Sequence, residues 1–165
     1  GVEKDTDKRY SGQRSWEFEV KNQGWRYHMS NIMAAIGLEQ LRSFDDAANK
    51  RKKLAKLYDN LLSGQSEINL LVRDYEQVVP HIYVVLIPGM KNRKLLQKNL
   101  LNKNIQTGIH YQPNHWLSLY IDPNAEPLPI TESVFPQMLT LPLHADLSED
   151  DVRTVTNTLI SEILK

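Results

Sequence analysis

Residues 24–41 read GWRYHMSNIMAAIGLEQL, and this stretch runs from a polar, aromatic start into the least polar helix that the sequence predicts. Ser30 suits the N-cap position, where its hydroxyl can accept a hydrogen bond from the first helical turn. Apolar residues then recur at helical spacing from Ile32 to Phe44. The stretch therefore predicts a helix that starts directly after Ser30.

Arg26, Tyr27 and His28 stand immediately before this helix start. Unpaired N–H groups and the helix dipole favour an anion at such a position, and a cation with a hydroxyl would suit a phosphate. A solvated loop followed by an ordinary N-cap explains the same residues, because capped helix starts are common. From the residues alone, both interpretations stay open.

The helical pattern continues well beyond this stretch, until a Ser-Gly pair at 63–64 provides a typical stop. We expect one long helix over 30–64. Its first half is apolar and contains the small residues Ala34, Ala35 and Gly37, where another backbone could approach. We therefore expect this half to pack against something beyond the domain.

The rest of the chain alternates short strands with helices. Period-two alternation marks the strands, and helical spacing with capping residues marks the helices. Strands are expected over 14–20, 78–88, 105–111 and 139–144, and helices over 91–104, 130–138 and 148–165. This order predicts an α/β (α+β) fold with a small sheet covered by helices.

Two of these helices carry further signals. Ser148 and Asp151 have the spacing of a capping box at the start of the last helix. In the helix over 91–104, four leucines are expected to face inward, namely Leu95, Leu96, Leu100 and Leu101. We expect three parts in the chain: a connecting segment with a strand over 1–29, a linking helix over 30–64 and a small domain over 65–165.

Composition excludes several classes of function. The 20 basic and 20 acidic side chains among 165 residues cancel, which argues against a nucleic-acid partner. The chain has no cysteine, so it has no disulfide or thiolate site, and this is compatible with the cytoplasm. The most apolar stretch, 78–90, is too short to span a membrane. The polar N-terminus resembles a surface loop, so we treat the chain as a possible fragment.

The stretch GIHYQPNHW, residues 108–116, follows a predicted strand and offers His110, Tyr111 and His115. Zinc requires three or four ligands, and no third ligand lies nearby in the sequence, so we expect no metal. A loop that presents imidazole and phenol to a ligand is one interpretation, because strand ends often carry function. The other is that His110 only satisfies backbone groups in the core.

Four motifs, taken in order, resemble one known family. They are GWRYHMSNIMAAIGLEQL at 24–41, HIYVV at 81–85, NIQTGIHYQPNH at 104–115 and LTLPLHADLSEDDV at 139–152. Over nearly its whole length the chain resembles the C-terminal portion of the DegT/DnrJ/StrS sugar aminotransferases. The resemblance implies the small C-terminal domain of fold-type-I pyridoxal-phosphate enzymes, the aspartate-aminotransferase fold, with a mostly antiparallel sheet. These enzymes move an amino group, usually from glutamate, onto a nucleotide-linked keto-sugar that feeds lipopolysaccharide or other surface glycans.

The resemblance also implies residue roles near the cofactor. Arg26, Tyr27 and His28 would lie in a turn that reaches across a homodimer interface to the cofactor phosphate of the partner subunit. The match is imperfect, since many members have asparagine at the position of Arg26 and arginine at that of His28. For the substrate, the resemblance implies a pocket near His110, with Tyr111 and His115 as neighbours.

The lysine that forms the Schiff base lies upstream in this family, in the large N-terminal domain. Lys4, Lys8 and Lys21 do not stand in the family's lysine motif. We therefore expect no catalytic residue in this chain, and no activity from the chain alone.

Two alternatives remain open. The chain could be a freestanding, non-catalytic module that keeps the fold for dimerisation or ligand binding. It could also belong to a dehydratase relative, in which histidine replaces the Schiff-base lysine.

Overall fold

The computed structural model describes residues 2–3, 19–20, 23, 25, 27, 29–122 and 124–164. The chain divides into two compact units, Gly1–Arg42 and Ser43–Lys165. In the first unit, strand β1 (Val2–Glu3) pairs antiparallel with β2 (Glu19–Val20). The strand expected over 14–20 is therefore present at its last two residues, and its first part lies outside the described residues.

Helix α2 (Asn31–Arg42) begins where its sequence predicts. The N–H of Met33 donates to Oγ of Ser30 at 3.2 Å, which confirms Ser30 as the N-cap. No residue of α2 is buried within the chain. Leu38 and Leu41 are 60% and 69% exposed, so apolar side chains of this helix face solvent.

The range 30–64, expected as one helix, contains two. Helix α3 (Phe44–Leu62) is separated from α2 by Ser43, whose φ of −93° and ψ of 1° lie outside the α-helical well. The two residues after Phe44 are aspartates in the first turn of α3, where acidic side chains favour a helix N-terminus. A second start signal therefore lies within the stretch whose apolar spacing predicted an unbroken helix.

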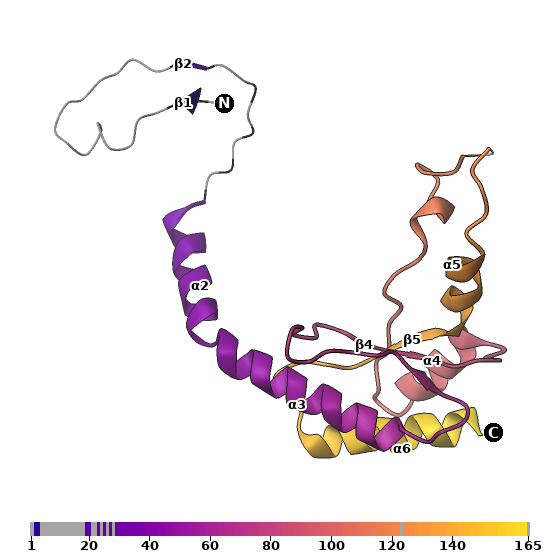
Figure 1. Cartoon of the computed structure of the whole chain (residues 1–165). Coiled ribbons are helices and arrows are strands. Elements are labelled where there is room, and N and C mark those ends of the chain that lie inside the picture. Colours follow the sequence, from indigo (N-terminus) through magenta and orange to yellow (C-terminus); the bar gives the residue numbers. More distant parts are fainter. Residues whose placement is uncertain are drawn as a thin grey trace. The chain divides into compact units, whose positions relative to one another are not determined.

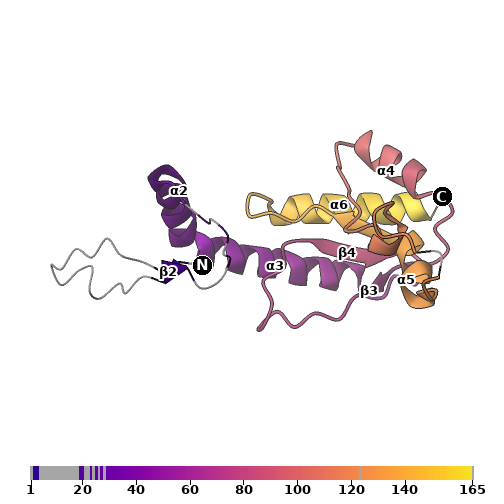
Figure 2. The same ribbon diagram turned by 90° about the horizontal axis from the view of Figure 1, so that it is seen from above.

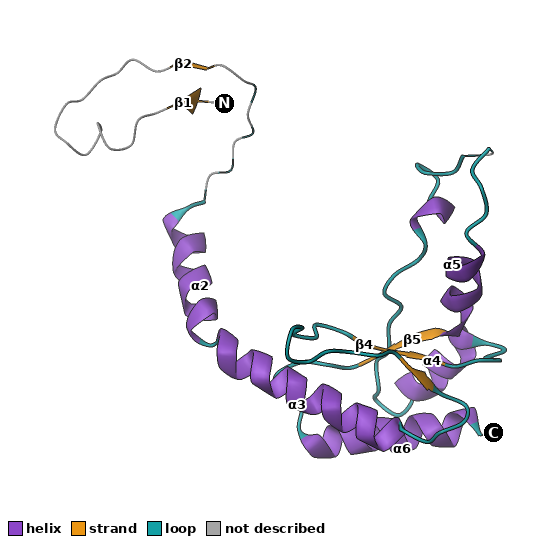
Figure 3. Cartoon of the chain, viewed as in Figure 1, coloured by secondary structure: helices purple, strands orange, loops and turns teal. Residues whose placement is uncertain are grey.

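The second unit is built on a three-stranded antiparallel sheet in the order β3-β4-β5. Figure 3 shows its strands in orange, with β4 and β5 labelled. Its strands are β3 (Asn69–Leu70), β4 (Tyr83–Leu86) and β5 (Met138–Leu141). β4 is central and pairs with both neighbours. Gly108 forms an isolated bridge to Thr140, so residue 108 extends the sheet beyond β5.

Helices cover one face of this sheet. α3 and α6 (Glu149–Ile163) run side by side beneath it, and α4 (Arg93–Leu101) packs against α6 (Figures 1 and 2). Because side chains alternate along a strand, Tyr83, Val85 and Leu139 point to this face. There they join one core with side chains from all three helices, including Leu54, Tyr58, Leu62, Leu100, Val152 and Leu159.

The opposite face of the sheet carries the alternate residues, among them Val84 and Thr140, which pair across β4 and β5. Figure 1 shows the segments 111–122 and 124–128 reaching away from the sheet on this side. They contain a short 3-10 helix, η1 (Asn114–Trp116), and lead into α5 (Pro129–Val134) and η2 (Phe135–Gln137).

Most of the expected elements are confirmed, and so is the fold class of a small antiparallel sheet covered by helices. The capping box is also confirmed, because Ser148 Oγ accepts from the N–H of Asp151 and the Asp151 carboxylate accepts from the N–H of Ser148. The strand expected over 105–111 is wrong beyond the single bridge at Gly108. The sequence analysis missed β3, which pairs through only two residues.

Of the four leucines of α4 that were expected to face inward, two do so. Leu96 and Leu100 are buried in the core, whereas Leu95 and Leu101 are 53% and 58% exposed. A nine-residue helix that packs along one line contacts the core at positions i and i+4, so the flanking leucines stay outside.

Candidate functional site

His110 lies at the edge of the sheet, two residues after the bridge at Gly108. Gly108 and Thr140 exchange both backbone hydrogen bonds, at 2.9 and 2.8 Å. The imidazole lies back over this bridge, and its Nδ1 is 3.0 Å from Oγ1 of Thr140. The backbone pairing therefore positions the side chain that the sequence selected.

Tyr111 and His115 have different surroundings. The ring of Tyr111 meets that of His110 edge to face at 4.8 Å, and Tyr111 is 67% exposed. His115 Nε2 lies 3.2 Å from Oε1 of Glu132, and the N–H of Leu128 donates to the same oxygen at 3.3 Å. Glu132 therefore joins the outgoing and returning limbs of the projecting segment.

An aromatic contact fixes the base of this segment. The Trp116 ring meets the Phe135 ring edge to face at 5.2 Å. The guanidinium of Arg93 lies 4.5 Å from the centre of the Phe135 ring, and its Nη1 donates to the Phe135 carbonyl at 2.6 Å. Partial burial lowers the pKa of Arg93. These contacts attach the segment to the start of α4.

The helix start that the sequence singled out is described only in part. Tyr27 is 89% exposed, whereas Arg26 and His28 lie outside the described residues. The first turn of α2 contains no acidic side chain. No negative charge from that turn therefore compensates the positive end of the helix dipole. Within the described ranges, no group of three or more histidine, aspartate or glutamate residues could hold a metal ion.

The sequence analysis missed a polar cluster around Asp59 on α3. Tyr75 and Tyr83 donate to the two carboxylate oxygens of Asp59 at 2.5 and 2.6 Å. Arg73 donates to the Val84 carbonyl and lies 3.4 Å from the same carboxylate. Burial and the Asp59 carboxylate raise the pKa of both tyrosines. No local spacing signal links these residues, because they come from α3, the loop after β3 and the start of β4.

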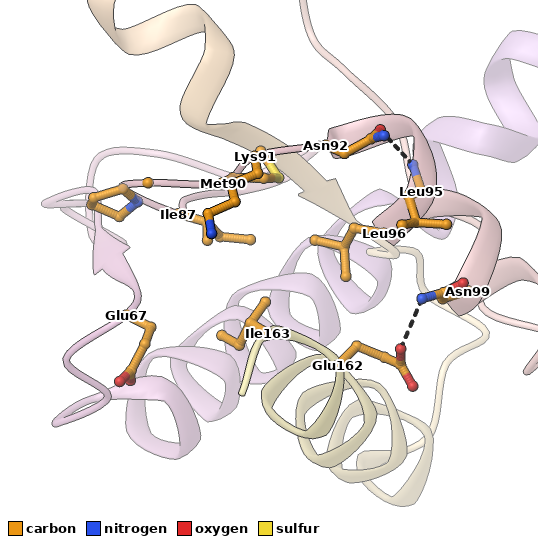
Figure 4. A pocket seen from close by; sticks show the side chains of 12 residues that line it. Glu67, Ile87, Met90, Lys91, Asn92, Leu95, Leu96, Asn99, Glu162 and Ile163 are labelled. Atoms are coloured by element: carbon orange, nitrogen blue, oxygen red, sulfur yellow. Dashed lines mark hydrogen bonds between the residues drawn. The ribbon is translucent and has the colours of Figure 1, made fainter. Parts of the chain in front are cut away.

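A pocket of about 420 Å³ lies between α4, α6 and the end of β4 (Figure 4). Glu162 lines it with a side chain only 3% exposed. Its carboxylate accepts from Asn99 at 3.0 Å and from Lys103 at 2.8 Å. These bonds tie α4 to α6. The candidate substrate residues His110, Tyr111 and His115 do not line this pocket.

The helices give one further finding: none in the part of the chain that the structure describes is long and apolar enough to cross a membrane.

Comparison with known proteins identifies the family. The model of the DegT/DnrJ/EryC1/StrS aminotransferase family matches residues 1–160. The chain belongs to this family. The match includes the helix start, the edge residue His110 and the projecting segment, so the features described above lie within the family's domain.

Three relatives illustrate the similarity. The chain is 27% identical to UDP-4-amino-4,6-dideoxy-N-acetyl-beta-L-altrosamine transaminase of Campylobacter jejuni, over 92% of this chain and 42% of that protein. It is 31% identical to dTDP-4-dehydro-2,3,6-trideoxy-D-glucose 4-aminotransferase of Saccharopolyspora spinosa, over 92% of this chain and 39% of that protein. The solved structure of Spr1654 from Streptococcus pneumoniae in its PMP form matches with a TM-score of 0.82 and 28% identity, over 100% of this chain and 43% of that one. The chain thus spans about two fifths of the length of these relatives.

Proposed function

We propose that this chain is the C-terminal part of a pyridoxal-phosphate-dependent aminotransferase that acts on nucleotide-linked keto-sugars. Glutamate would be the amino donor, and the product would enter the biosynthesis of lipopolysaccharide or other surface glycans. The observation that carries the proposal is the family match over residues 1–160. Relatives named for UDP- and dTDP-linked sugars support the substrate class.

Two features of the described residues support a phosphate contact at the start of α2. Tyr27 has an exposed hydroxyl ahead of α2, and no acidic side chain in the first turn opposes an anion. In this proposal Arg26, Tyr27 and His28 contact the cofactor phosphate of a partner subunit. When bound, pyridoxal phosphate supplies the electron sink for amino transfer. The lysine that holds it belongs to the N-terminal part of the protein.

The substrate residues are His110, Tyr111 and His115. His110 is held at the sheet edge through Nδ1, so its ring is oriented before a ligand arrives. The hydroxyl of Tyr111 stands beside it on an exposed side chain. His115 is paired with Glu132, and this contact holds together the projecting segment that carries both residues.

The proposal also covers the assembly. We infer a homodimer, since the proposed phosphate contact comes from the partner subunit, and we propose that it is cytoplasmic. Residues 1–29 would form the connecting segment, 30–64 the linking region and 65–165 the small domain. The separate 165-residue chain would not transfer amino groups.

The test uses the full-length protein that contains this chain. It is loaded with pyridoxal phosphate and mixed with glutamate, and the absorbance of the bound cofactor is followed. A nucleotide-linked keto-sugar, UDP- or dTDP-linked, is then added. The proposal expects glutamate to change the absorbance and the keto-sugar to restore it, with an aminated sugar detected by mass. No change with glutamate, together with cofactor-independent dimerisation, would instead favour the non-catalytic module.

A further inference from the structure

Thr140 is the buried polar side chain nearest to the proposed substrate residue. It is 5% exposed and lies in β5, with its backbone paired to Val84 on one side and to Gly108 on the other. A residue held by two strand neighbours has little freedom to move. Its hydroxyl is therefore a fixed reference point for the His110 ring, 3.0 Å away.

Gly108 completes this arrangement. A Cβ at position 108 would lie 2.7 Å from Cε1 of His110, closer than side chains tolerate, and 3.3 Å from Nδ1, which is a tight contact. The ring thus rests against the glycine backbone, in space that any other residue would occupy. Together, Gly108 and Thr140 form what we call the His110 seat.

The direction of the Thr140 hydroxyl proton determines which tautomer the His110 ring adopts. A threonine hydroxyl has one proton to donate, and leaving a buried donor unpaired is costly. Among the residues that the structure describes, Nδ1 of His110 is the one recorded acceptor within hydrogen-bond distance of Oγ1 of Thr140. The proton therefore points to Nδ1, and a neutral ring must then carry its own proton on Nε2.

We propose that Thr140 is a positioning residue that holds His110 as the neutral Nε2–H tautomer and turns this N–H toward the substrate. The inference rests on the proposed function, which it deepens. A neutral N–H donor recognises an acceptor oxygen, such as a hydroxyl or carbonyl of the sugar. Such a donor binds without placing a charge beside the substrate, and its direction is set by the seat.

The first test reads the ring directly and needs neither cofactor nor substrate. Nitrogen NMR of the histidine-labelled full-length protein at about pH 8.5 reports neutral rings. A His110→Gln sample identifies the signals of His110. We expect the Nε2–H tautomer in the wild type. In Thr140→Val its ratio to the other tautomer should fall about fivefold, the net worth of one hydrogen bond.

Two variants serve as controls. Thr140→Ser keeps the hydroxyl and should restore the wild-type pattern. Thr156→Val removes another buried hydroxyl, which donates to the Val152 carbonyl in α6, and should leave the His110 signals unchanged. A wild-type ring protonated on Nδ1, or an unchanged pattern in Thr140→Val, would overturn the proposal.

The second test measures steady-state kinetics of the full-length enzyme with the same variants. Thr140→Val should raise KM for the nucleotide-sugar about fivefold, while kcat changes less than about twofold. Thr140→Ser and Thr156→Val should keep the wild-type KM. An unchanged KM in Thr140→Val would overturn the role in substrate binding. If the full-length protein transfers no amino group, the proposed function fails, and the NMR result still decides the state of His110.

Discussion

At the scale of single residues, the cluster around Asp59 shows how one carboxylate can hold three segments of the chain together. Tyr83 is completely buried, and its hydroxyl donates to Asp59 at 2.6 Å, while its ring stacks on Tyr58 at 4.6 Å. The guanidinium of Arg73 also lies over the Tyr83 ring, 4.3 Å from the ring centre. The Tyr83 hydroxyl is thus hydrogen-bonded and its ring is packed against neighbours. Removing the hydroxyl should therefore lower the stability of the fold.

Tyr83→Phe should lower the free energy of unfolding by about 2 kcal/mol, because a buried hydrogen bond to a carboxylate is lost. Urea unfolding followed by circular dichroism measures the change. The matched control is Tyr120→Phe, since Tyr120 is 59% exposed and should change stability by less than about 0.5 kcal/mol. Equal effects of the two substitutions would show that the Asp59 contact does not stabilise the fold.

The same cluster predicts a loss of stability in alkali. Burial and the Asp59 carboxylate raise the pKa of Tyr75 and Tyr83 above the ordinary value for tyrosine. Unfolded tyrosines lose their protons near pH 10, roughly, whereas the folded ones keep them to higher pH. Raising the pH therefore favours the unfolded chain, and the stability that is complete below about pH 10 falls above it.

Unfolding measured between about pH 9 and pH 11 should show this decline, with at most about 1.4 kcal/mol per pH unit from each tyrosine. Tyr83→Phe should give a shallower slope than the wild type. The control Tyr120→Phe should keep the wild-type slope. A Tyr83→Phe slope as steep as that of the wild type would contradict the assignment.

At the scale of elements, local signals predicted well wherever the same few residues both form and cap a helix. The last helix is the clearest case, because Ser148 and Asp151 satisfy each other's backbone groups within one turn. The cluster around Asp59 was missed because its partners are distant in sequence, and strand β3 was missed because it has only two residues. The break at Ser43 was missed because apolar spacing continues through it.

Ser148→Ala should lower the free energy of unfolding by about 1 kcal/mol, the usual cost of a lost N-cap. Thermal or urea unfolding measures it. Ser161→Ala is the control, since Ser161 is exposed within the same helix and alanine is the better helix former. The account expects Ser161→Ala to be neutral or slightly stabilising. Equal losses in both variants would mean that the capping box contributes little.

In the candidate site, too, the sequence predicted some features and missed others. The sequence selected His110, but Gly108 and Thr140 that seat it could not be recognised, since residues 110 and 140 meet only through the sheet. The pairing of His115 with Glu132 likewise depends on the projecting segment folding back on itself. Residue type indicates which side chains could act, whereas the contacts that orient them come from the tertiary fold.

At the scale of the whole molecule, the chain spans about two fifths of the length of its relatives and has an uncovered apolar helix. Ile32 and Leu41 of α2 are 74% and 69% exposed, more than an isolated soluble domain usually leaves in one place. We expect α2 to pack on another part of the full-length protein. In the 165-residue chain its apolar side chains remain available to a second copy.

The isolated chain should therefore dimerise or aggregate at high concentration, as light scattering would show. Replacing Ile32 and Leu41 together by glutamate should shift it toward the monomer without lowering the stability of the second unit. Leu119→Glu is the control, because Leu119 is 82% exposed in the projecting segment and its replacement should leave self-association unchanged. A wild-type chain that stays monomeric at high concentration would contradict this expectation.

The most direct test of the central claim is amino transfer by the full-length protein with His110 replaced. We would measure kcat/KM for a nucleotide-linked keto-sugar in the wild type, in His110→Gln and in His81→Gln, where His81 is exposed outside the site. The account predicts a loss of about tenfold or more for His110→Gln, as for a lost substrate contact, and no loss for His81→Gln. Equal values for all three proteins would show that the sheet edge at His110 is not the substrate site.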